Sequence, residues 1–186
     1  ITMQNPYQLT DKVALITGGT EGIGFETAKV FIKLGARVVI TGRTLQKLEK
    51  AKRELGESCF LYQNDATDKK CHQQLVDFIE REIGELDILV NNAGKHLKKP
   101  TIEVTDEEFQ AVIDTNLNSA FALTRTVLKP MLKRRRGSVI FISSMAALYG
   151  LEKIIAYTSS KTALVGMVRA LASEYSSHGV RFNAIA

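Results

Sequence analysis

Short apolar runs alternate with longer amphipathic segments along almost the whole chain. The short runs are rich in Val, Ile and Leu and end at Gly, Asn or Ser, which is typical of buried strands. The longer segments place apolar residues at helical spacing, as at Leu75, Ile79 and Ile83. The pattern predicts strands at residues 12–17, 37–41, 59–63, 86–90, 138–143 and 180–185. It predicts helices at residues 23–34, 45–55, 69–83, 106–136 and 157–177, with Asp106 as the cap of the fourth.

Strands that alternate with helices through short connections predict right-handed crossovers and a mostly parallel sheet. Nearly continuous apolar strands require helices on both faces of that sheet. We therefore expect an α/β fold, a Rossmann-type doubly wound parallel sheet in a three-layer α/β/α arrangement. Ligands of such sheets bind beyond the carboxyl ends of the strands, so the residues that follow each strand form the candidate site.

A glycine-rich turn follows the first predicted strand, with its glycines spaced as G-x-x-x-G-x-G. Glycines let the backbone approach a phosphate, and free N–H groups at the start of the next helix attract its negative charge. An ordinary tight strand-to-helix turn would also explain the glycines. The candidate phosphate-binding positions in this turn are Gly18, Thr20, Glu21, Gly22, Ile23 and Gly24.

The end of the second strand bears on the choice of nucleotide. NAD-binding folds usually place a carboxylate there, which accepts a hydrogen bond from the ribose. Here no acid stands at that place, and Arg43 follows Gly42. A guanidinium suits a 2′-phosphate through its charge and fork geometry, which favours NADP(H). Glu21 argues the other way, because its carboxylate would repel a nearby phosphate.

Polar and small residues follow the third and fourth strands. Asp65, which precedes Ala66, could accept a hydrogen bond from an adenine amino group or could close a turn. Asn92, Ala93 and Gly94 follow the fourth strand, where small residues let a ligand lie against the backbone. A plain turn would explain this second segment equally well.

A candidate proton-transfer pair lies in the last predicted helix. Tyr157 and Lys161 are four residues apart and therefore share one face of that helix. A free phenol has a pKa of about 10, and a neighbouring ammonium lowers the pKa of such a group toward the range of acid–base catalysis. Ser144 follows the fifth strand. A lone Tyr-x-x-x-Lys, however, would be an ordinary surface pair.

Together these motifs resemble the short-chain dehydrogenase/reductase family, whose pattern is T-G-x-x-x-G-x-G, N-N-A-G, Asn, Ser and Y-x-x-x-K. The chain has them in this order at residues 17–24 and 91–94 and at Asn116, Ser144, Tyr157 and Lys161. Within the family it looks most like 3-oxoacyl-carrier-protein reductases and gluconate- or sugar-type dehydrogenases. The resemblance implies one dinucleotide-binding domain over residues 1–186, truncated before the substrate-binding C-terminal segment.

The resemblance also implies roles for individual residues. Tyr157 would be the general acid in carbonyl reduction and the base in the reverse reaction. Lys161 would lower the pKa of Tyr157 and hold the nicotinamide ribose. Ser144 would bind the substrate oxygen, and Asn116 would hold a water in a proton relay. The cofactor would be bound by Gly18, Thr20, Glu21, Gly22, Ile23, Gly24, Arg43, Asp65, Ala66, Asn92, Ala93, Gly94, Tyr157 and Lys161.

The expected activity is hydride transfer between NADP(H), with NAD(H) as the alternative cofactor, and a small-molecule carbonyl or secondary-alcohol substrate. The competing interpretations are an NAD-dependent sugar or alcohol dehydrogenase and a non-catalytic dinucleotide-binding module. Relatives of this kind commonly form tetramers or dimers through their long helices. A homo-oligomer, most simply a homotetramer, is therefore expected.

Composition narrows the choice of partners. The chain is 45% hydrophobic and 24% charged, which is typical of soluble globular proteins, and it holds no apolar run long enough to cross a membrane. Part of its net charge of +5 lies at residues 133–136. This basic run follows a helical pattern and has no interleaved aromatics, so it predicts a solvated helix end and no nucleic-acid site.

The cysteines and histidines indicate neither a disulfide framework nor a metal site. Cys59 and Cys71 are the only cysteines, which favours a reducing, cytoplasmic setting. His72, His96 and His178 are scattered and are expected to be surface or loop residues. No group of His, Cys and carboxylate residues has the spacing of metal ligands.

Overall fold

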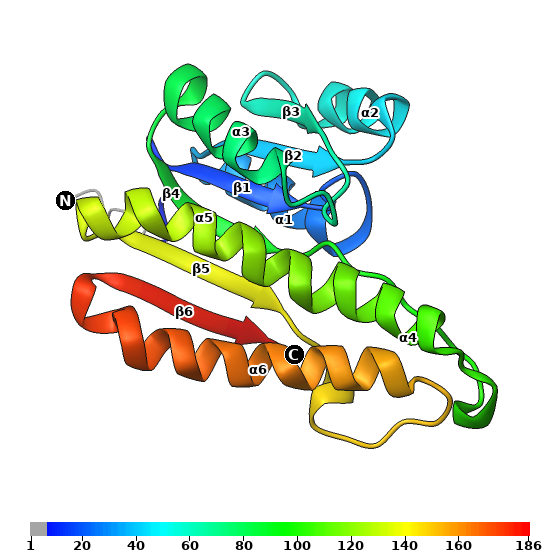
Figure 1. Ribbon diagram of the computed structural model, residues 1–186. Helices are drawn as coiled ribbons and strands as arrows, with labels where there is room; N and C mark the ends of the chain where they lie inside the picture. Colours follow the sequence, from blue (N-terminus) through cyan, green and yellow to red (C-terminus); the bar gives the residue numbers. More distant parts are fainter. Residues whose placement is uncertain (1–6) are drawn as a thin grey trace.

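The computed structural model describes residues 7–186, and its strands form one parallel sheet (Figure 1). The strand order is β3-β2-β1-β4-β5-β6, so the direction of winding reverses between β1 and β4. This order confirms the expected α/β, doubly wound arrangement. The strands are β1 (Val13–Thr17), β2 (Arg37–Gly42), β3 (Cys59–Gln63), β4 (Leu86–Asn91), β5 (Gly137–Ile142) and β6 (Val180–Ile185).

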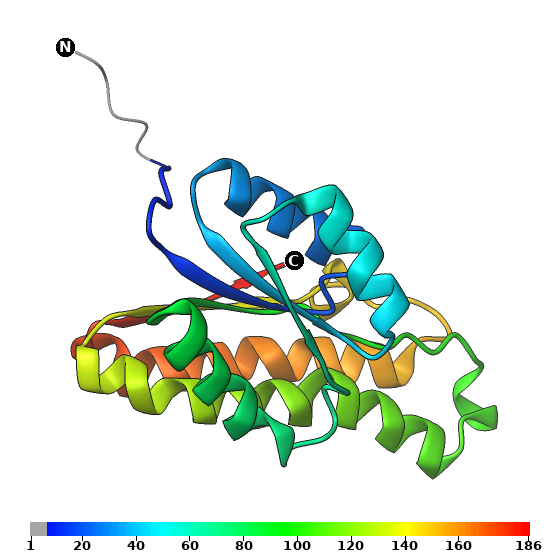
Figure 2. The same ribbon diagram turned by 90° about the horizontal axis from the view of Figure 1, so that it is seen from above.

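Helices connect the strands and form two outer layers. The α-helices are α1 (Gly22–Lys33), α2 (Leu45–Leu55), α3 (Cys71–Phe78), α4 (Asp106–Ile113), α5 (Ser119–Arg134) and α6 (Ile155–Tyr175). Seen from above, α1 and α2 cover one face of the sheet, whereas α3, α4, α5 and α6 cover the other (Figure 2). The short segments are the π-helices η1 (Ile79–Ile83) and η3 (Asp114–Asn118) and the 3-10 helices η2 (Thr101–Glu103), η4 (Met145–Ala147) and η5 (Ser176–His178).

The core follows the alternation of side chains along each strand. Ala14 and Ile16 of β1 point to the layer of α1 and α2, where they join Leu48 in one buried cluster. Leu15 points to the opposite face and packs in a second cluster that contains Leu75 of α3. Burying both faces explains why the strands read as continuous apolar runs.

The strand register brings the polar strand ends together. Thr17 of β1 is level with Thr41 of β2, and Ile16 is level with Val90 of β4. The carboxyl ends of these three strands therefore lie at one edge of the sheet, at the point where the winding reverses. The turns that follow them form the floor of the candidate site.

The long helix predicted over residues 106–136 differs from the structure in three ways. The N-cap is Thr105, not Asp106: the Thr105 hydroxyl accepts from the Glu108 amide at 3.2 Å, and the Glu108 carboxylate accepts from the Thr105 amide at 3.0 Å. This reciprocal capping box leaves Asp106 as the first helical residue. The π-helix η3 separates α4 from α5, and α5 ends at Arg134, before a left-handed Arg135. Hydrophobic periodicity does not register a π-helical insertion, so the sequence pattern missed it.

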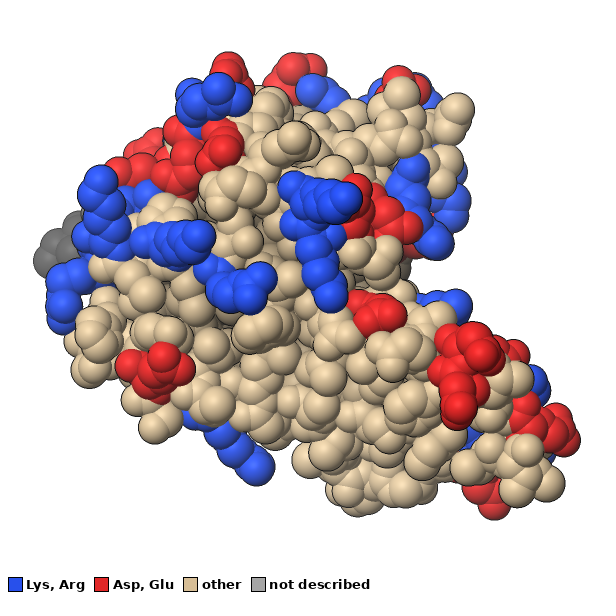
Figure 3. Space-filling view, viewed as in Figure 1, with Lys and Arg blue, Asp and Glu red and all other residues tan. Residues whose placement is uncertain are grey.

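The basic run at the end of α5 is tied to acidic residues of the same chain. Arg134 forms an ion pair with Glu80 at 2.8 Å, and Arg136 pairs with Glu85 at 3.0 Å and with Asp87 at 3.1 Å. Figure 3 shows blue and red side chains side by side in this region. These pairs support the interpretation of the run as a helix end. Within the described part of the chain, no helix has the length and apolar character needed to cross a membrane.

Candidate active site

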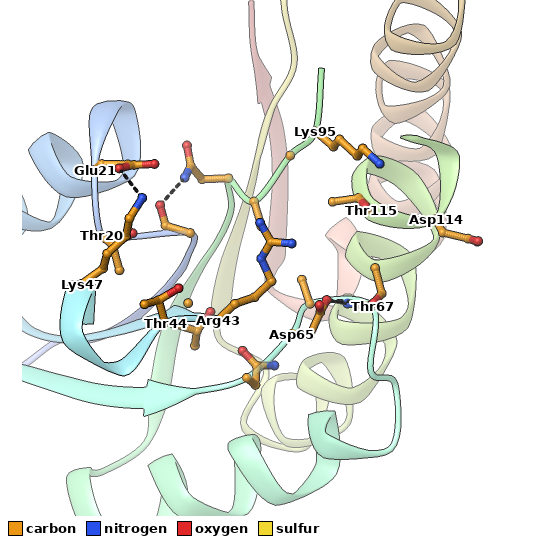
Figure 4. Close-up of a pocket in the computed structure, with 18 of the residues that line it drawn as sticks. Thr20, Glu21, Arg43, Thr44, Lys47, Asp65, Thr67, Lys95, Asp114 and Thr115 are labelled. Carbon is orange, nitrogen blue, oxygen red and sulfur yellow. Dashed lines mark hydrogen bonds and ion pairs between the residues drawn. The ribbon is translucent and has the colours of Figure 1, made fainter. Parts of the chain in front are cut away.

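A cavity of about 670 Å³ opens at the carboxyl edge of the sheet (Figure 4). Its walls come from the turns after β1, β2, β3 and β4 and from η3. Most of the predicted cofactor positions line it, namely Gly18, Thr20, Glu21, Arg43, Asp65, Ala66, Asn92, Ala93 and Gly94. The predicted positions that do not line it begin helix α1 or lie on α6, namely Gly22, Ile23, Gly24, Tyr157 and Lys161.

The glycine turn has two separate structural requirements. Gly18 has a φ of 64°, a left-handed conformation that side chains with a Cβ rarely adopt. A Cβ on Gly24 would overlap the Asn92 side-chain nitrogen and the Gly18 carbonyl oxygen, so this position must stay small. Helix α1 begins here with no side-chain cap and no acidic residue in its first turn. Its first N–H groups therefore remain available to an anion such as a pyrophosphate.

Hydrogen bonds join this turn to the end of β4. The Thr17 hydroxyl accepts from the backbone amides of Asn92 and Ala93, both at 3.0 Å. The Asn92 side-chain amide donates in return to the carbonyls of Thr17 at 2.9 Å and Gly18 at 3.0 Å. Asn92 therefore uses both side-chain hydrogens to fix the turn, and its part in the site is to shape the cavity.

The carboxylate of Asp65 closes a turn, which was one of its two predicted roles. Its Oδ1 accepts from the Thr67 backbone amide at 2.9 Å and from the Thr67 hydroxyl at 2.8 Å. These hydrogen bonds hold the pKa of Asp65 below its usual range. Because Asp65 also lines the cavity, its negative charge lies on the wall opposite Glu21 (Figure 4).

Lys47, in the first turn of α2, is a cavity residue that sequence reasoning missed. Its ammonium forms an ion pair with the Glu21 carboxylate at 3.0 Å and lies on the same wall (Figure 4). The prediction treated Glu21 as an uncompensated carboxylate, and the structure corrects that picture. Its position four residues after Arg43 was the only signal that could have indicated this lysine.

His72 is buried, which contradicts the expectation of a surface histidine. The residue is 2% exposed, and Nε2 is 3.1 Å from the carbonyl oxygen of Ala66 on the cavity wall. Burial lowers the pKa of His72. The pattern failed here because one histidine in an amphipathic helix does not show which face it occupies.

At the other end of the site, Lys161 is buried beneath the tyrosine of the predicted pair. Its ammonium donates to the Ile142 carbonyl at 2.6 Å and lies 5.5 Å from the centre of the Tyr157 ring. The Ser143 hydroxyl donates to the Lys161 carbonyl at 3.1 Å, which fastens α6 to the end of β5. Burial lowers the pKa of Lys161 to about 8, so the group keeps most of its charge at neutral pH.

Ser144 and His96 approach the same region from two loops. The Ser144 hydroxyl accepts from the Ala146 amide at 3.1 Å, and its own hydrogen remains free to donate. The His96 ring lies 4.7 Å from the Tyr157 ring, centre to centre. His96 is an exposed loop residue, as expected, and it lies next to the predicted catalytic tyrosine.

Asn116 lies in η3 and is almost fully buried. Its oxygen accepts from the Lys95 amide at 2.6 Å, and its nitrogen donates to the Lys95 carbonyl at 3.0 Å and the Ser160 hydroxyl at 2.9 Å. The side chain thus ties the loop after Gly94 to helix α6. A Cβ on Gly94 would lie 3.5 Å from Asn116 Oδ1 and 3.7 Å from Lys161 Nζ, so the loop after β4 and the Lys161 ammonium are neighbours.

The fold and this site define a class of nucleotide-dependent oxidoreductases, and comparison with known proteins shows the same class. The family model described as short chain dehydrogenase matches residues 12–186. The chain belongs to this family, as its motifs indicated. In the structure, the motifs after β1 and β4 line one cavity, and Lys161 of α6 lies beside Gly94 at its border.

Three relatives show how close the similarity is. The chain is 35% identical to the 3-oxoacyl-(acyl-carrier-protein) reductase FabG of Chlamydia muridarum, over 96% of this chain and 73% of the relative. It is also 35% identical to the 2-dehydro-3-deoxy-D-gluconate 5-dehydrogenase of Pseudoalteromonas atlantica, over 99% and 74%. The third is a solved structure described as an NAD(P)-dependent gluconate 5-dehydrogenase from Beutenbergia cavernae, with NADP bound at low occupancy. Its TM-score is 0.90 and its identity is 33%, over 97% of this chain and 73% of that one.

Proposed function

We propose that the protein is an NADP(H)-dependent oxidoreductase that interconverts a carbonyl compound and a secondary alcohol, with Tyr157 as the general acid and base. The observation that carries this proposal is the position of the Lys161 ammonium. It is buried, it lies 5.5 Å from the Tyr157 ring, and it adjoins Gly94 in the loop after β4. Burying a cation is costly, so a purely structural role would not favour a lysine there.

Each residue then has a physical task. In reduction, the Tyr157 hydroxyl gives its proton to the substrate oxygen, and the Lys161 charge stabilises the phenolate that remains. The free hydroxyl hydrogen of Ser144 is suited to holding the substrate oxygen during this transfer. When bound, the nicotinamide supplies or accepts the hydride. Asn116 positions the loop of Gly94 and Lys95 against α6, which keeps the proton donor beside the cofactor cavity.

The cavity fits a dinucleotide with a 2′-phosphate. Its walls supply small residues at the strand ends and the Arg43 guanidinium at the end of β2, and the uncapped start of α1 follows directly after the wall residue Glu21. No carboxylate stands at that strand end, because β2 finishes in Gly42 and is followed by Arg43 and Thr44. The relative with bound NADP supports the same choice.

The names of the relatives suggest which carbonyl compounds to test. One is a reductase of 3-oxoacyl thioesters on a carrier protein, and another is a dehydrogenase of a sugar acid. We propose a carbonyl substrate of one of these two classes. A screen of 3-oxoacyl thioesters, keto sugar acids and simple ketones, followed through the absorbance of NADPH, tests the activity. No turnover with any class, despite tight NADPH binding, would leave a binding module as the better account.

A paired titration tests the cofactor. Intrinsic fluorescence of NADPH and NADH gives the two dissociation constants, first for the unaltered protein and then for Arg43→Ala. Loss of a charge-assisted contact predicts that the variant binds NADPH about 10- to 100-fold more weakly and NADH almost unchanged. Equal affinities for both cofactors, unaffected by the substitution, would refute the NADP(H) preference.

We further propose that the protein forms a homo-oligomer, a tetramer or a dimer, through α4, α5 and α6 and that it works in the reducing cytoplasm. Exposed apolar groups on α5 support the first point, since Phe121 is 46% exposed. Both cysteines are unpaired, which supports the second. Analytical ultracentrifugation tests the oligomer, and a monomer at micromolar concentration would contradict it.

A further inference from the structure

Two charged side chains from different elements meet on one wall of the cofactor cavity. Glu21 is the residue before α1, and Lys47 lies in the first turn of α2. Their charged atoms are 3.0 Å apart, and the side chains are 75% and 57% exposed. An ion pair with this exposure contributes little to stability, so the fold gives only a weak reason for it.

The same wall carries a second cation whose side chain is uncommitted. Within residues 7–186, the Arg43 guanidinium has no hydrogen bond or ion pair, and only its backbone carbonyl accepts one, from Gln63. Its charge nevertheless reaches the cavity, since it helps to lower the pKa of Asp65. Figure 4 shows Arg43 extending into the cavity between the Glu21–Lys47 pair and Asp65.

Around the end of β2, the cavity wall therefore brings together the cations of Arg43 and Lys47 and the anion of Glu21, and Asp65 lies on the opposite wall. A phosphate monoester carries about −1.5 to −2 charges at neutral pH, more than a carboxylate. It would therefore compete with Glu21 for Lys47, whereas a ribose hydroxyl would not. The ion pair need not be displaced for NAD(H), which has no 2′-phosphate.

We propose that Lys47 is the second cation of the 2′-phosphate subsite and that Glu21 is its internal competitor, which the phosphate displaces when NADP(H) binds. This inference rests on the proposed NADP(H)-dependent function. It assigns to Glu21 an indirect effect on affinity, exerted through Lys47. It also makes Lys47 a residue that distinguishes NADP(H) from NAD(H), beside Arg43.

Isothermal titration with 2′,5′-ADP and 5′-AMP tests the subsite without involving the catalytic residues. Lys47→Gln is expected to weaken 2′,5′-ADP binding about three- to ten-fold and to leave 5′-AMP unchanged. Glu21→Gln is expected to tighten 2′,5′-ADP binding about two- to five-fold. The tightening must disappear in the Glu21→Gln, Lys47→Gln double variant, because no lysine is then left to release.

Two control variants remove the same charges outside the cavity. Lys50→Gln lies one turn nearer the middle of α2 and Glu26→Gln lies on α1, and both residues are exposed. Neither control should change the preference for 2′,5′-ADP over 5′-AMP by more than about two-fold at moderate salt, since their charges are screened. Similar melting temperatures across the set would show that the effects are local.

The outcomes separate this inference from the proposed function. If the unaltered protein prefers 2′,5′-ADP and Arg43→Ala removes the preference, but Lys47→Gln does not alter it, Lys47 has no role and the inference is wrong. If Glu21→Gln tightens binding equally with and without Lys47, Glu21 acts by direct repulsion and the competition is refuted. If the unaltered protein shows no preference at all, the NADP(H) assignment fails first.

Discussion

The two ends of the site are built in opposite ways. At the proposed catalytic end, Asn116 and Lys161 are 1% and 4% exposed and make hydrogen bonds to fixed backbone atoms. At the proposed adenosine end, Glu21, Arg43 and Lys47 are exposed, and their interactions are an ion pair and free charges. The catalytic end cannot change one residue without leaving a buried polar group unpaired, whereas the adenosine end can exchange charges at little cost to the fold.

This contrast predicts that substitutions are tolerated at the adenosine end and not at the catalytic end. Proton transfer needs a fixed distance between donor and substrate, so its groups are held by buried contacts. Discrimination between NADP(H) and NAD(H) needs only a positive charge near the 2′-phosphate, so the charged side chains can come from several surface positions. The predictions below test whether the burial at the catalytic end is needed for chemistry or only for stability.

Among the variants that keep Tyr157, Lys161→Met should have the largest effect on turnover. Loss of the charge beside Tyr157 is expected to lower the rate about 100-fold or more. The folded protein should become more stable at neutral pH, because the desolvation cost of the buried cation outweighs the loss of its hydrogen bond to the Ile142 carbonyl. Rate measurements and thermal unfolding of the same samples check both effects.

The pH dependence of the Lys161→Met comparison has a definite sign. The pKa of Lys161 is about 8 in the folded state, below its ordinary value of 10.5. Between these values the unfolded chain binds more protons, so the unaltered protein gains stability as pH rises. The advantage of the variant should therefore shrink from about pH 8 upward. A stability difference that stays constant over that range would show that the pKa of Lys161 does not differ between the folded and unfolded states, which would contradict the effect of burial.

Gly24→Ala should disrupt the joint between the glycine turn and β4. The new Cβ would overlap the Asn92 side chain and the Gly18 carbonyl, which is expected to cost about 1–3 kcal/mol of stability and most of the cofactor affinity. Gly166→Ala in α6 is the matched control, since a Cβ there meets nothing within 4 Å. That control should raise stability by about 0.5–1 kcal/mol through helix propensity. Equal changes in stability at both glycines would contradict the close approach of Gly24 to the Asn92 side chain and the Gly18 carbonyl.

Asn116→Ala should leave both backbone groups of Lys95 without their side-chain partner. The expected cost is about 1–3 kcal/mol of unfolding free energy, together with a lower kcat, because the Gly94 loop is no longer tied to α6. Asn118→Ala is a matched control in the same π-helix, where the side chain bonds to Asp114 at 2.6 Å and not to the loop. Urea unfolding and steady-state rates distinguish them. A drop in kcat of the same size in both variants would exclude the anchoring role.

The smallest expected effect is an acid dependence of stability at His72. Burial puts the folded-state pKa of His72 below its ordinary value of 6.5. Its contribution to stability should be complete above about pH 6.5 and should be lost as pH falls through the folded-state pKa, because the unfolded chain takes up the proton first. His72→Gln should lose that part of the pH dependence, and the exposed control His178→Gln should keep it. Melting temperatures at stepped pH values provide the measurement.

The sequence predicted the parts of the site that depend on local spacing. Tyr157 and Lys161 share a helix face because they are four residues apart, and the strand ends carry Gly18 and Gly94 to one edge because all strands run parallel. The pair of Glu21 and Lys47 was not predictable in this way, because it depends on how the turn after β1 meets α2.

Two other features also depended on tertiary structure, whereas the cap at Thr105 has the local spacing of a capping box with Glu108 and could have been read from the sequence. The burial of His72 depends on the rotation of α3. The π-helix that carries Asn116 adds a residue to a helical turn without altering the hydrophobic pattern. In each case several local conformations suit the sequence, and packing selects one of them.

The most direct test of the proposed chemistry is turnover and cofactor binding of Tyr157→Phe, measured on one preparation with a carbonyl substrate found in the screen. The ring and its contacts with His96 and Lys161 are retained, so the NADPH dissociation constant should change by less than about two-fold. Removal of the proton donor should lower kcat about 100- to 10,000-fold. Turnover close to that of the unaltered protein, with NADPH still bound, would contradict the assignment of Tyr157 as the general acid and base.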